Sequence, residues 1–441
     1  MNYESYIALA IAFGAALLAL WTRFRQVWDA GSAVRVTVPD DCEIHEADRP
    51  TDLETEGESL ENYDYIESPT PDSDENGPVG DDAACAVEEL SETLGVKVPK
   101  ASVIVYSVTQ EEQIFDYLSG IMRQDYPDYE VILVNEGSAE TTSELASRLK
   151  ATFPERLYVT FIPGDSRNLS RRKLAQMVGI KAASGDVVVT TASNCRVPSR
   201  CWLSDLMRPF VEDPAVDVSL GYSHMDFSCL TGAWKWYRQM DATLTDCQWI
   251  GAAREGKPYR GDRNNLAFRR SLFFDNKGYA NTIHLVNGDD DLFLRDIMNS
   301  ENTRTAISTD SILTAEWGES SDRVLGDMKE HYQFTARFLP RWPFLMAGFS
   351  SIMQWVVVAC CALAVLAGLC TPQWWFSAAA AAVILLGLWL TQILIYRRTA
   401  RRLGSVCLWW SLPLFLLWHP VANFFFKLRC RARIRKNYTF T

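Results

Sequence analysis

The sequence predicts an α/β domain with a mainly parallel sheet, held between apolar helices near the two ends of the 441-residue chain. Buried strands and amphipathic helices alternate from residue 98 onward, and this alternation is typical of a parallel sheet covered by helices on both faces. Long apolar segments precede and follow this region. A strongly acidic stretch, residues 40–82, separates the first apolar segment from the domain.

The first apolar segment runs from Tyr6 to Trp21 and is followed by Arg23 and Arg25. Its length is near the minimum for a membrane-spanning helix. A cleavable signal peptide is the alternative, but the positive charges follow the apolar run and no basic segment precedes it. We therefore predict a transmembrane anchor over residues 1–26, with the chain after Arg23 in the cytoplasm by the positive-inside rule.

Residues 27–97 are predicted to form an acidic, disordered linker. Its central part, residues 40–82, contains 17 acidic residues and only one basic residue, Arg49. Such a composition buries too little apolar surface to offset the entropy of folding. The net charge of −12 belongs to this linker, since the rest of the chain is about +4. No long basic and aromatic run indicates nucleic-acid binding outside the membrane flanks.

The globular region shows the alternation in detail. One expected helix places Ile114, Leu118 and Ile121 on the same face. Ligands usually bind at the carboxyl ends of parallel strands in such folds. The expected elements are strands over residues 101–107, 131–134, 158–162 and 187–190, and helices over residues 111–123, 141–152 and 171–183.

Residues 343–426 are predicted to be membrane segments, and residues 427–441 a basic tail. Two apolar runs, joined by a short turn, form a hairpin over residues 352–396 that is long enough to cross the bilayer twice. A third run, residues 406–426, contains Pro413 and Pro420 and has basic residues on both sides. It is re-entrant or interfacial if both flanks stay in the cytoplasm, and a third span otherwise.

Three adjacent carboxylates, Asp289, Asp290 and Asp291, stand between Gly288 and Leu292. A carboxylate in such a run can take a proton from a hydroxyl while its neighbours hold a ligand. The alternative is a solvated helix N-terminus, where acidic residues are favoured by the helix dipole. Both interpretations can hold together. Beside membrane segments, the triplet predicts group transfer onto something that the membrane carries.

The region from Val98 to Trp342 resembles the family 2 glycosyltransferases with a GT-A fold, of the membrane-anchored bacterial kind. The resemblance rests on the order and spacing of four blocks, none of which is specific alone: residues 102–105, 124–138, 173–183 and 288–292. It implies that residues 98–342 form a Rossmann-like nucleotide-sugar domain between an N-terminal transmembrane helix and C-terminal transmembrane helices. The fold class is α/β.

The resemblance also implies roles for individual residues. Asp290 stands where the family has the base that deprotonates the acceptor hydroxyl, with Asp289 and Asp291 beside it. Glu136 matches the acid that contacts the donor nucleoside, next to Asn135. The other expected donor-binding residues are Ser107, Thr109, Lys173, Ser193, Asn194, Arg263, Asn265, Lys329 and His331.

The chain departs from the family after the fourth expected strand. The family has Asp-x-Asp there, and these acids hold a divalent cation that neutralises the diphosphate leaving group. Here Ala192 offers no ligand, and Asn194 offers one neutral oxygen. Mg²⁺ or Mn²⁺ is therefore a cofactor in doubt, with Asn194 and His284 as candidate ligands.

Three interpretations of this departure are open. In the first, a metal is held by other groups, such as His284, His331 or the acidic triplet. In the second, the enzyme is metal-independent, and cationic side chains bind the diphosphate. The candidates are Arg171, Arg172, Lys173 and Lys329. In the third, the domain is an inactive relative of the family, and the retained acidic triplet disfavours this interpretation.

We expect a multi-pass protein of the inner (cytoplasmic) membrane with its catalytic domain in the cytoplasm. The resemblance implies that it transfers a sugar from a nucleotide-sugar donor to a lipid-linked or membrane-delivered acceptor of the cell envelope. The resemblance implies inversion of the anomeric configuration of the transferred sugar, which is usual in the family. The processive signature Gln-x-x-Arg-Trp is absent after Gln333, which favours single additions over a polysaccharide synthase. An inactive scaffold or sugar-nucleotide-binding subunit is the alternative.

Overall fold

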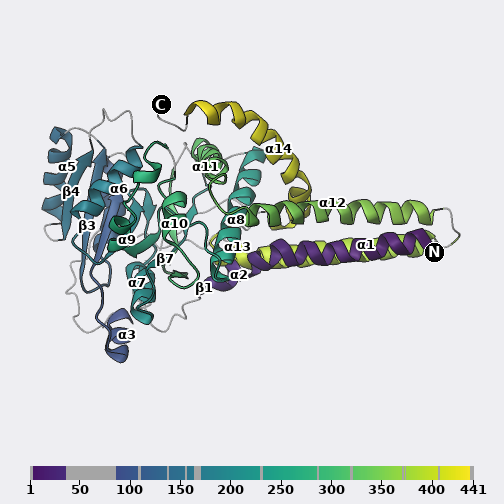
Figure 1. The fold of residues 1–441 in the computed structure, drawn as a ribbon, viewed down its shortest axis with the longest axis horizontal. Helices are drawn as coiled ribbons and strands as arrows, with labels where there is room; N and C mark the ends of the chain where they lie inside the picture. Colours follow the sequence, from purple (N-terminus) through teal and green to yellow (C-terminus); the bar gives the residue numbers. More distant parts are fainter. Residues whose placement is uncertain are drawn as a thin grey trace, which may run out of the picture.

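The computed structural model places an α/β domain at one end of the molecule and a bundle of long helices at the other (Figure 1). The predicted acidic stretch 40–82 and Thr109 lie outside the described residues. The structure describes residues 3–35, 86–107, 111–136, 139–153, 156–162, 170–228, 232–285, 288–317, 321–369, 372, 374–405 and 408–437.

A seven-stranded sheet forms the centre of the α/β domain, in the order β10-β7-β9-β5-β2-β3-β4. The strand β2 pairs in parallel with β3 and β5, whereas β9 runs antiparallel to its neighbours β5 and β7. The strands are β2 (Ala101–Tyr106), β3 (Tyr129–Glu136), β4 (Leu157–Ile162), β5 (Val187–Ala192), β7 (Val218–Leu220), β9 (Leu266–Arg269) and β10 (Thr303–Thr305).

Helices cover both faces of this sheet, as the alternation predicts. Odd-numbered residues of β2, such as Val103, pack with α4, α5 and α7, while Ile104 packs on the other side with α6, α9 and α10. Burial on both faces explains the nearly continuous apolar strands. The predicted α/β fold is confirmed. The helices are α4 (Glu111–Met122), α5 (Ala139–Thr152), α6 (Arg171–Ala182), α7 (Trp202–Glu212), α9 (Arg270–Asp275) and α10 (Asp291–Ile297).

A smaller sheet closes over the carboxyl end of β5. It has the order β6-β12-β8, with β6 at Cys195–Arg196, β8 at Ser223–Met225 and β12 at Leu313–Ala315. The backbone N–H of Glu316, just after β12, donates to the carbonyl of Asn194 at 2.9 Å. The segment that replaces Asp-x-Asp is therefore held against the region that follows the acidic triplet.

The N-terminal helix continues beyond the predicted anchor. It consists of α1 (Tyr3–Ala19), the π-helical turn η1 (Leu20–Phe24) and α2 (Arg25–Ala33), and ends in β1 (Val34–Arg35), which pairs with β11 (Ile307–Ser308). Residues 27–35 are thus helix and strand, not linker as predicted, because Val27 and Ala30 are buried against α8 (Gly232–Arg254). A Cβ at Gly251 of α8 would lie 2.2 Å from the carbonyl oxygen of Gln26, so this contact requires glycine.

The acidic segment is also ordered at its far end. The helix α3 (Ala86–Leu94) packs against α7 and buries Val87. The globular domain therefore begins before residue 98, because this helix adds apolar surface to the core cluster on the α7 face.

Three described helices are long and apolar enough to cross a membrane: residues Tyr3–Ala33, α12 (Trp342–Gly368) and α13 (Trp374–Arg402). They lie side by side in the bundle (Figure 1). The last helix, α14 (Leu412–Asn437), follows the short η6 (Trp409–Ser411), leaves the bundle and curves back over the α/β domain near α11 (Ser321–Thr335) (Figure 1). This course favours the interfacial alternative for residues 406–426.

Candidate active site

The acidic triplet lies at the start of α10, and each of its carboxylates faces a different arginine. All three acids are buried. An ionised carboxylate is costly to bury without a partner, so these ion pairs are what allow the triplet to lie inside the domain. The pairs are Asp289–Arg172 at 3.0 Å, Asp290–Arg263 at 3.1 Å and Asp291–Arg260 at 3.0 Å.

Local backbone geometry fixes the triplet in this place. Gly288 has a φ of +93°, and a Cβ there would come within 2.7 Å of two side-chain atoms of Leu292. Asp290 is the N-cap of α10, and its Oδ1 accepts a hydrogen bond from the backbone N–H of Asp291 at 2.8 Å. The helix-terminus interpretation therefore holds, although the acids are buried and not solvated.

Asp290 has the most strongly perturbed environment of the three acids. Its Oδ2 accepts from Arg263 Nε, and its Oδ1 lies 3.1 Å from His331 Nε2. Burial alone would raise the pKa of Asp290, but Arg263 and then His331 outweigh burial and hold this pKa well below its usual range. For Asp291 burial prevails over Arg260 and raises the pKa. The ionised form is therefore favoured more strongly in Asp290 than in Asp291.

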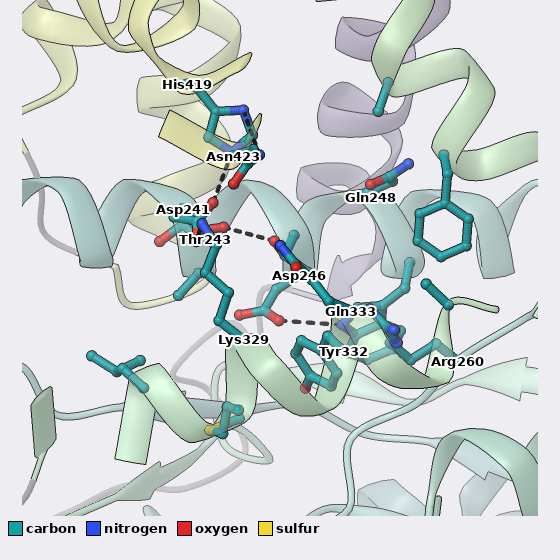
Figure 2. A pocket seen from close by; sticks show the side chains of 18 of the residues that line it. Asp241, Thr243, Asp246, Gln248, Arg260, Lys329, Tyr332, Gln333, His419 and Asn423 are labelled. Carbon is teal, nitrogen blue, oxygen red and sulfur yellow. Dashed lines mark hydrogen bonds and ion pairs between the residues drawn. The ribbon is translucent and has the colours of Figure 1, made fainter. Parts of the chain in front are cut away.

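A cavity of about 1680 Å³ adjoins this network. Arg172, Arg260, Arg263 and His331 form part of its wall, and the three acids lie behind them. The cavity continues between α8, α11 and α14 (Figure 2) and reaches α12 at residues such as Ala359. A single space thus joins the α/β domain to the candidate membrane helices.

The predicted nucleoside-binding residues lie together at the carboxyl ends of β2 and β3. Glu136 accepts a hydrogen bond from the Tyr106 hydroxyl at 2.8 Å and pairs with Arg171. Asn135 and Ser107 are buried beside them. The guanidinium of Arg172 lies 5.5 Å from the centre of the Tyr106 ring and also lines the cavity, so it connects the two regions.

Two predicted donor-binding residues have structural partners instead. Lys173 is buried, and its Nζ donates to the carbonyls of Thr282 and Leu285 at 2.7 and 3.0 Å. Burial lowers the pKa of Lys173 to about 8. The Asn265 amide accepts from Trp202 Nε1 at 3.0 Å and donates to two backbone carbonyls. Buried polar groups need such partners, and neither side chain is part of the cavity wall.

Lys329, predicted to bind the donor, belongs to a cluster that the sequence did not reveal. Its Nζ donates to Asp241 Oδ2 at 2.6 Å, and His419 Nε2 lies 2.7 Å from Asp241 Oδ1 (Figure 2). Burial opposes ionisation of Asp241, but the hydrogen bond with His419 and the charge of Lys329 prevail and lower its pKa. The cluster joins α8, α11 and α14 on one side of the cavity.

Asp246, a second carboxylate of the cavity wall, was also missed. Trp249 Nε1 and the Tyr222 hydroxyl each donate to it at 3.3 Å, and it faces the cavity (Figure 2). Burial and the nearby Asp262 raise the pKa of Asp246 to about 7. In the sequence, Asp246 stands three residues before Trp249, and no motif marks it as a site residue.

Asp246→Asn is expected to change how stability depends on pH. The native pKa of about 7 exceeds the unfolded value, so the native state binds this proton more tightly, and the contribution of Asp246 to stability falls as pH rises from about 4 to about 7. Asn carries no charge at any pH. As pH rises from 4 to 8, the free energy of unfolding of the variant should increase relative to that of wild type by roughly 1–3 kcal/mol. Thermal unfolding at both pH values measures this, and a constant gap would mean that folding does not raise the pKa of Asp246.

The residues that replace Asp-x-Asp fit a divalent cation poorly. Ala192 has no ligand atom, and Asn194 donates through Nδ2 to the carbonyl of Glu316 at 2.9 Å. Asn194 Oδ1 is buried and has no hydrogen-bond partner among the described residues. Ser193 is buried between them, and His284 is exposed. One neutral oxygen is too little for a Mg²⁺ or Mn²⁺ site.

A second set of atoms has a spacing that could hold a metal. One ligand atom from each of Asp290, Asp291 and His331 lies within 4.8 Å of the others. Both carboxylates are, however, already paired with Arg263 and Arg260. A divalent cation would have to displace these guanidinium groups, so the chemistry of the present donor set favours the arginines.

Comparisons with known proteins found one family model and a set of solved structures. Residues 102–274 match the family model "Glycosyl transferase family 2". The chain matches no curated protein. Among solved structures, it is similar to a mannosyltransferase from Pyrobaculum calidifontis in complex with GDP-Man and Mn²⁺, at 19% identity and a TM-score of 0.45, over 74% of this chain and 88% of that one.

Two further structures are similar over shorter or weaker alignments. GalNAc-T7 with UDP, GalNAc and Mn²⁺ has 12% identity and a TM-score of 0.36, over 54% of this chain and 49% of its own. TarS residues 1–349 from S. aureus has 16% identity and a TM-score of 0.35, over 69% of this chain and 92% of its own.

The mixed α/β sheet, with a polar site at its strand ends, is a GT-A-like core. Residues 102–274 match the model of glycosyl transferase family 2, and apolar helices long enough to span a membrane lie on both sides of this segment. The predicted resemblance is confirmed. The acidic triplet lies beyond the matched segment, so its role rests on the geometry of the site.

Proposed function

We propose that the protein transfers a sugar from a nucleotide-sugar donor to an acceptor delivered from the membrane, with inversion and one addition at a time. The observation that carries this proposal is the continuous cavity between the arginine-lined site and α12. Pockets for one small ligand usually measure about 300–1,000 Å³. A volume of about 1680 Å³ gives room for a donor and part of an acceptor together.

The reaction assigns a role to each group of the network. The acceptor oxygen forms a bond with the anomeric carbon as the bond from that carbon to the diphosphate breaks, and the acceptor proton passes to Asp290. Arg263 and His331 keep Asp290 ionised, which is the form a base needs. The donor diphosphate would draw Arg263 away from Asp290, so donor binding would also restore the basicity of this carboxylate.

Arginines are proposed to take the place of the missing metal. Arg172 and Arg263 lie in the cavity wall next to the sheet edge and carry the charge that a leaving diphosphate requires. The proposed transfer and proton uptake do not require a metal ion. The basic residues at the end of α13, among them Arg401 and Arg402, support placing the catalytic domain in the cytoplasm by the positive-inside rule.

A thermal-stability screen tests the donor half of this proposal. Full-length protein in detergent would be heated with a panel of nucleotide sugars, with Mn²⁺ or with a chelator, since a ligand that binds the native state raises the unfolding temperature. We expect one donor to stabilise the protein equally in both conditions. Stabilisation only with Mn²⁺ would contradict the metal-independent scheme, and stabilisation by no donor would favour the inactive scaffold, which the loss of Asp-x-Asp suggests.

Restoring both acids should make donor binding depend on metal. In the double variant Ala192→Asp and Asn194→Asp, two carboxylates would face the proposed diphosphate site, where they repel the donor unless a cation lies between them. Without Mn²⁺ the apparent affinity for the donor, obtained from the rise in unfolding temperature, should then fall by at least about tenfold. It should recover when Mn²⁺ is added. Asn194→Asp alone is the control and should show a smaller dependence. An unchanged metal response of the double variant would show that these positions do not face the diphosphate.

A further inference from the structure

Arg23 is a buried cation at the point where the N-terminal helix leaves the bundle. It is only 8% exposed and lines the cavity. Its side chain makes no hydrogen bond or ion pair within 4.0 Å to any residue that the structure describes. Burying a guanidinium without an anion is costly, so this arrangement calls for an anionic ligand.

The π-helical turn η1 explains why Arg23 points inward. The backbone N–H of Arg25 bonds to the carbonyl of Leu20, which widens the helix by one residue at this turn. Trp21 is 57% exposed, and the Arg25 guanidinium lies 5.3 Å from its ring on the outer surface. Trp21 and Arg25 therefore face outward, while Arg23 between them is turned toward the cavity. Such π-turns are frequent at functional sites.

The cavity as a whole is cationic. Nine lysine or arginine residues line it against four aspartates, and the acidic triplet behind the wall reduces this excess from five to two. Arg172, Arg260 and Arg263 pair with the triplet, and Lys329 pairs with Asp241. Arg23 is different, because it is buried and no carboxylate among the described residues lies within 4.0 Å of it. The charge of Asp241 acts on Arg23 only from farther away, and Asp241 is already paired with Lys329 and His419. Arg23 remains available to a ligand.

The surroundings of Arg23 indicate what kind of anion this is. The turn η1 packs against α12, and the cavity wall on α12 is largely apolar. The exposed Arg341 lies at the start of the same helix and also lines the cavity. The wall residues on this stretch of α12 are Ser351, Ile352, Trp355, Val356 and Ala359. A molecule that fits both features has an anionic group next to an apolar chain.

We infer that Arg23 binds the phosphate group of a lipid acceptor whose apolar chain lies along α12. The inference rests on the proposed function, since it names the class of acceptor that enters the cavity from the membrane. A guanidinium binds phosphate oxygens through two parallel hydrogen bonds, and this geometry is stronger and more selective than a single charge contact. The phosphate holds the acceptor in place, while the donor uses the arginines near the acidic triplet.

The test measures binding, not turnover. Full-length protein in detergent would be titrated calorimetrically with a short-chain prenyl monophosphate, with the matching prenyl alcohol and with inorganic phosphate. Hydrogen bonds to a charged group predict that the prenyl phosphate binds at least about tenfold more tightly than the alcohol. Inorganic phosphate should bind more weakly than the prenyl phosphate, because it gains nothing from the apolar wall.

Three variants link this binding to Arg23. Arg23→Gln should bind the prenyl phosphate at least about tenfold more weakly, and Arg23→Lys should lose less, because it keeps the charge but not the paired hydrogen bonds. Arg25→Gln is the matched control: it removes a cation two residues away that is exposed and paired with Glu255, and it should bind like wild type. If Arg23→Gln does not fold, Arg23→Lys and the phosphate-to-alcohol comparison still decide.

Several outcomes would overturn the inference: equal binding of prenyl phosphate and prenyl alcohol by wild type, binding unaffected in both Arg23 variants, or inorganic phosphate binding as tightly as the lipid. The last result would show a general anion site. Nucleotide-sugar binding, measured on the same samples, should be unchanged in Arg23→Gln. If wild type binds no nucleotide sugar but still binds prenyl phosphate through Arg23, the transferase proposal fails and the lipid site stands.

Discussion

Asp290→Asn is expected to lower the rate of sugar transfer by roughly 10²–10⁴-fold, the usual contribution of a general base. Asn retains an oxygen that can accept the backbone N–H of Asp291, so the N-cap of α10 is preserved. It cannot take up the acceptor proton. Single-turnover transfer from a nucleotide sugar, followed by release of the nucleoside diphosphate, measures this loss.

Donor binding should not weaken in the same variant, because the base acts on the acceptor and the variant removes the charge that competes with the donor for Arg263. The matched control is Asp296→Asn, on the same helix, which removes an exposed acid that pairs with Arg295. The control should transfer sugar at the wild-type rate. Turnover that survives in Asp290→Asn would remove Asp290 from the mechanism and direct attention to Asp246, one of the carboxylates that line the cavity.

The strand and helix alternation could be predicted because it depends on local patterns. The apolar residues 101–106 and 187–192 are buried on both faces of the sheet, and this is the pattern that a central parallel strand requires. The linker boundary at residue 27 was wrong for the opposite reason. Val27 and Ala30 are buried against α8, where Gly251 allows the Gln26 carbonyl to approach closely, and no local pattern in residues 27–35 identifies that partner.

The candidate site could also be predicted only where its residues are adjacent in the sequence. The acidic triplet was visible as three adjacent residues, but its partners Arg172, Arg260 and Arg263 come from two other segments. Without them the triplet looks like a base and a metal site, and with them it becomes a nearly neutral buried network. The Asp241–Lys329–His419 cluster has no local signal, because tertiary packing alone brings three distant helices together.

Those ion pairs have a consequence for stability that is large enough to measure. Arg260→Met should lower the free energy of unfolding by roughly 3–5 kcal/mol, because it leaves the buried charge of Asp291 without its partner. Both side chains are almost fully buried, at 3% and 0% exposure. The variant also loses the packing of the guanidinium 4.0 Å from the Tyr332 ring centre. Thermal unfolding of the full-length protein should show a drop of roughly 10 °C.

A double variant separates the charge from the packing. In Arg260→Met with Asp291→Leu no buried charge remains, and replacing a buried pair by apolar residues is often nearly neutral. The Thr335 hydroxyl, which donates to Asp291 at 2.7 Å, can turn to the His331 carbonyl 3.2 Å away. Most of the lost stability should therefore return. Arg208→Met, which breaks the surface pair with Glu212, is the control and should cost less than about 1 kcal/mol. If Arg260→Met costs no more than this control, native Asp291 is protonated, as its raised pKa allows, and the network carries one negative charge fewer.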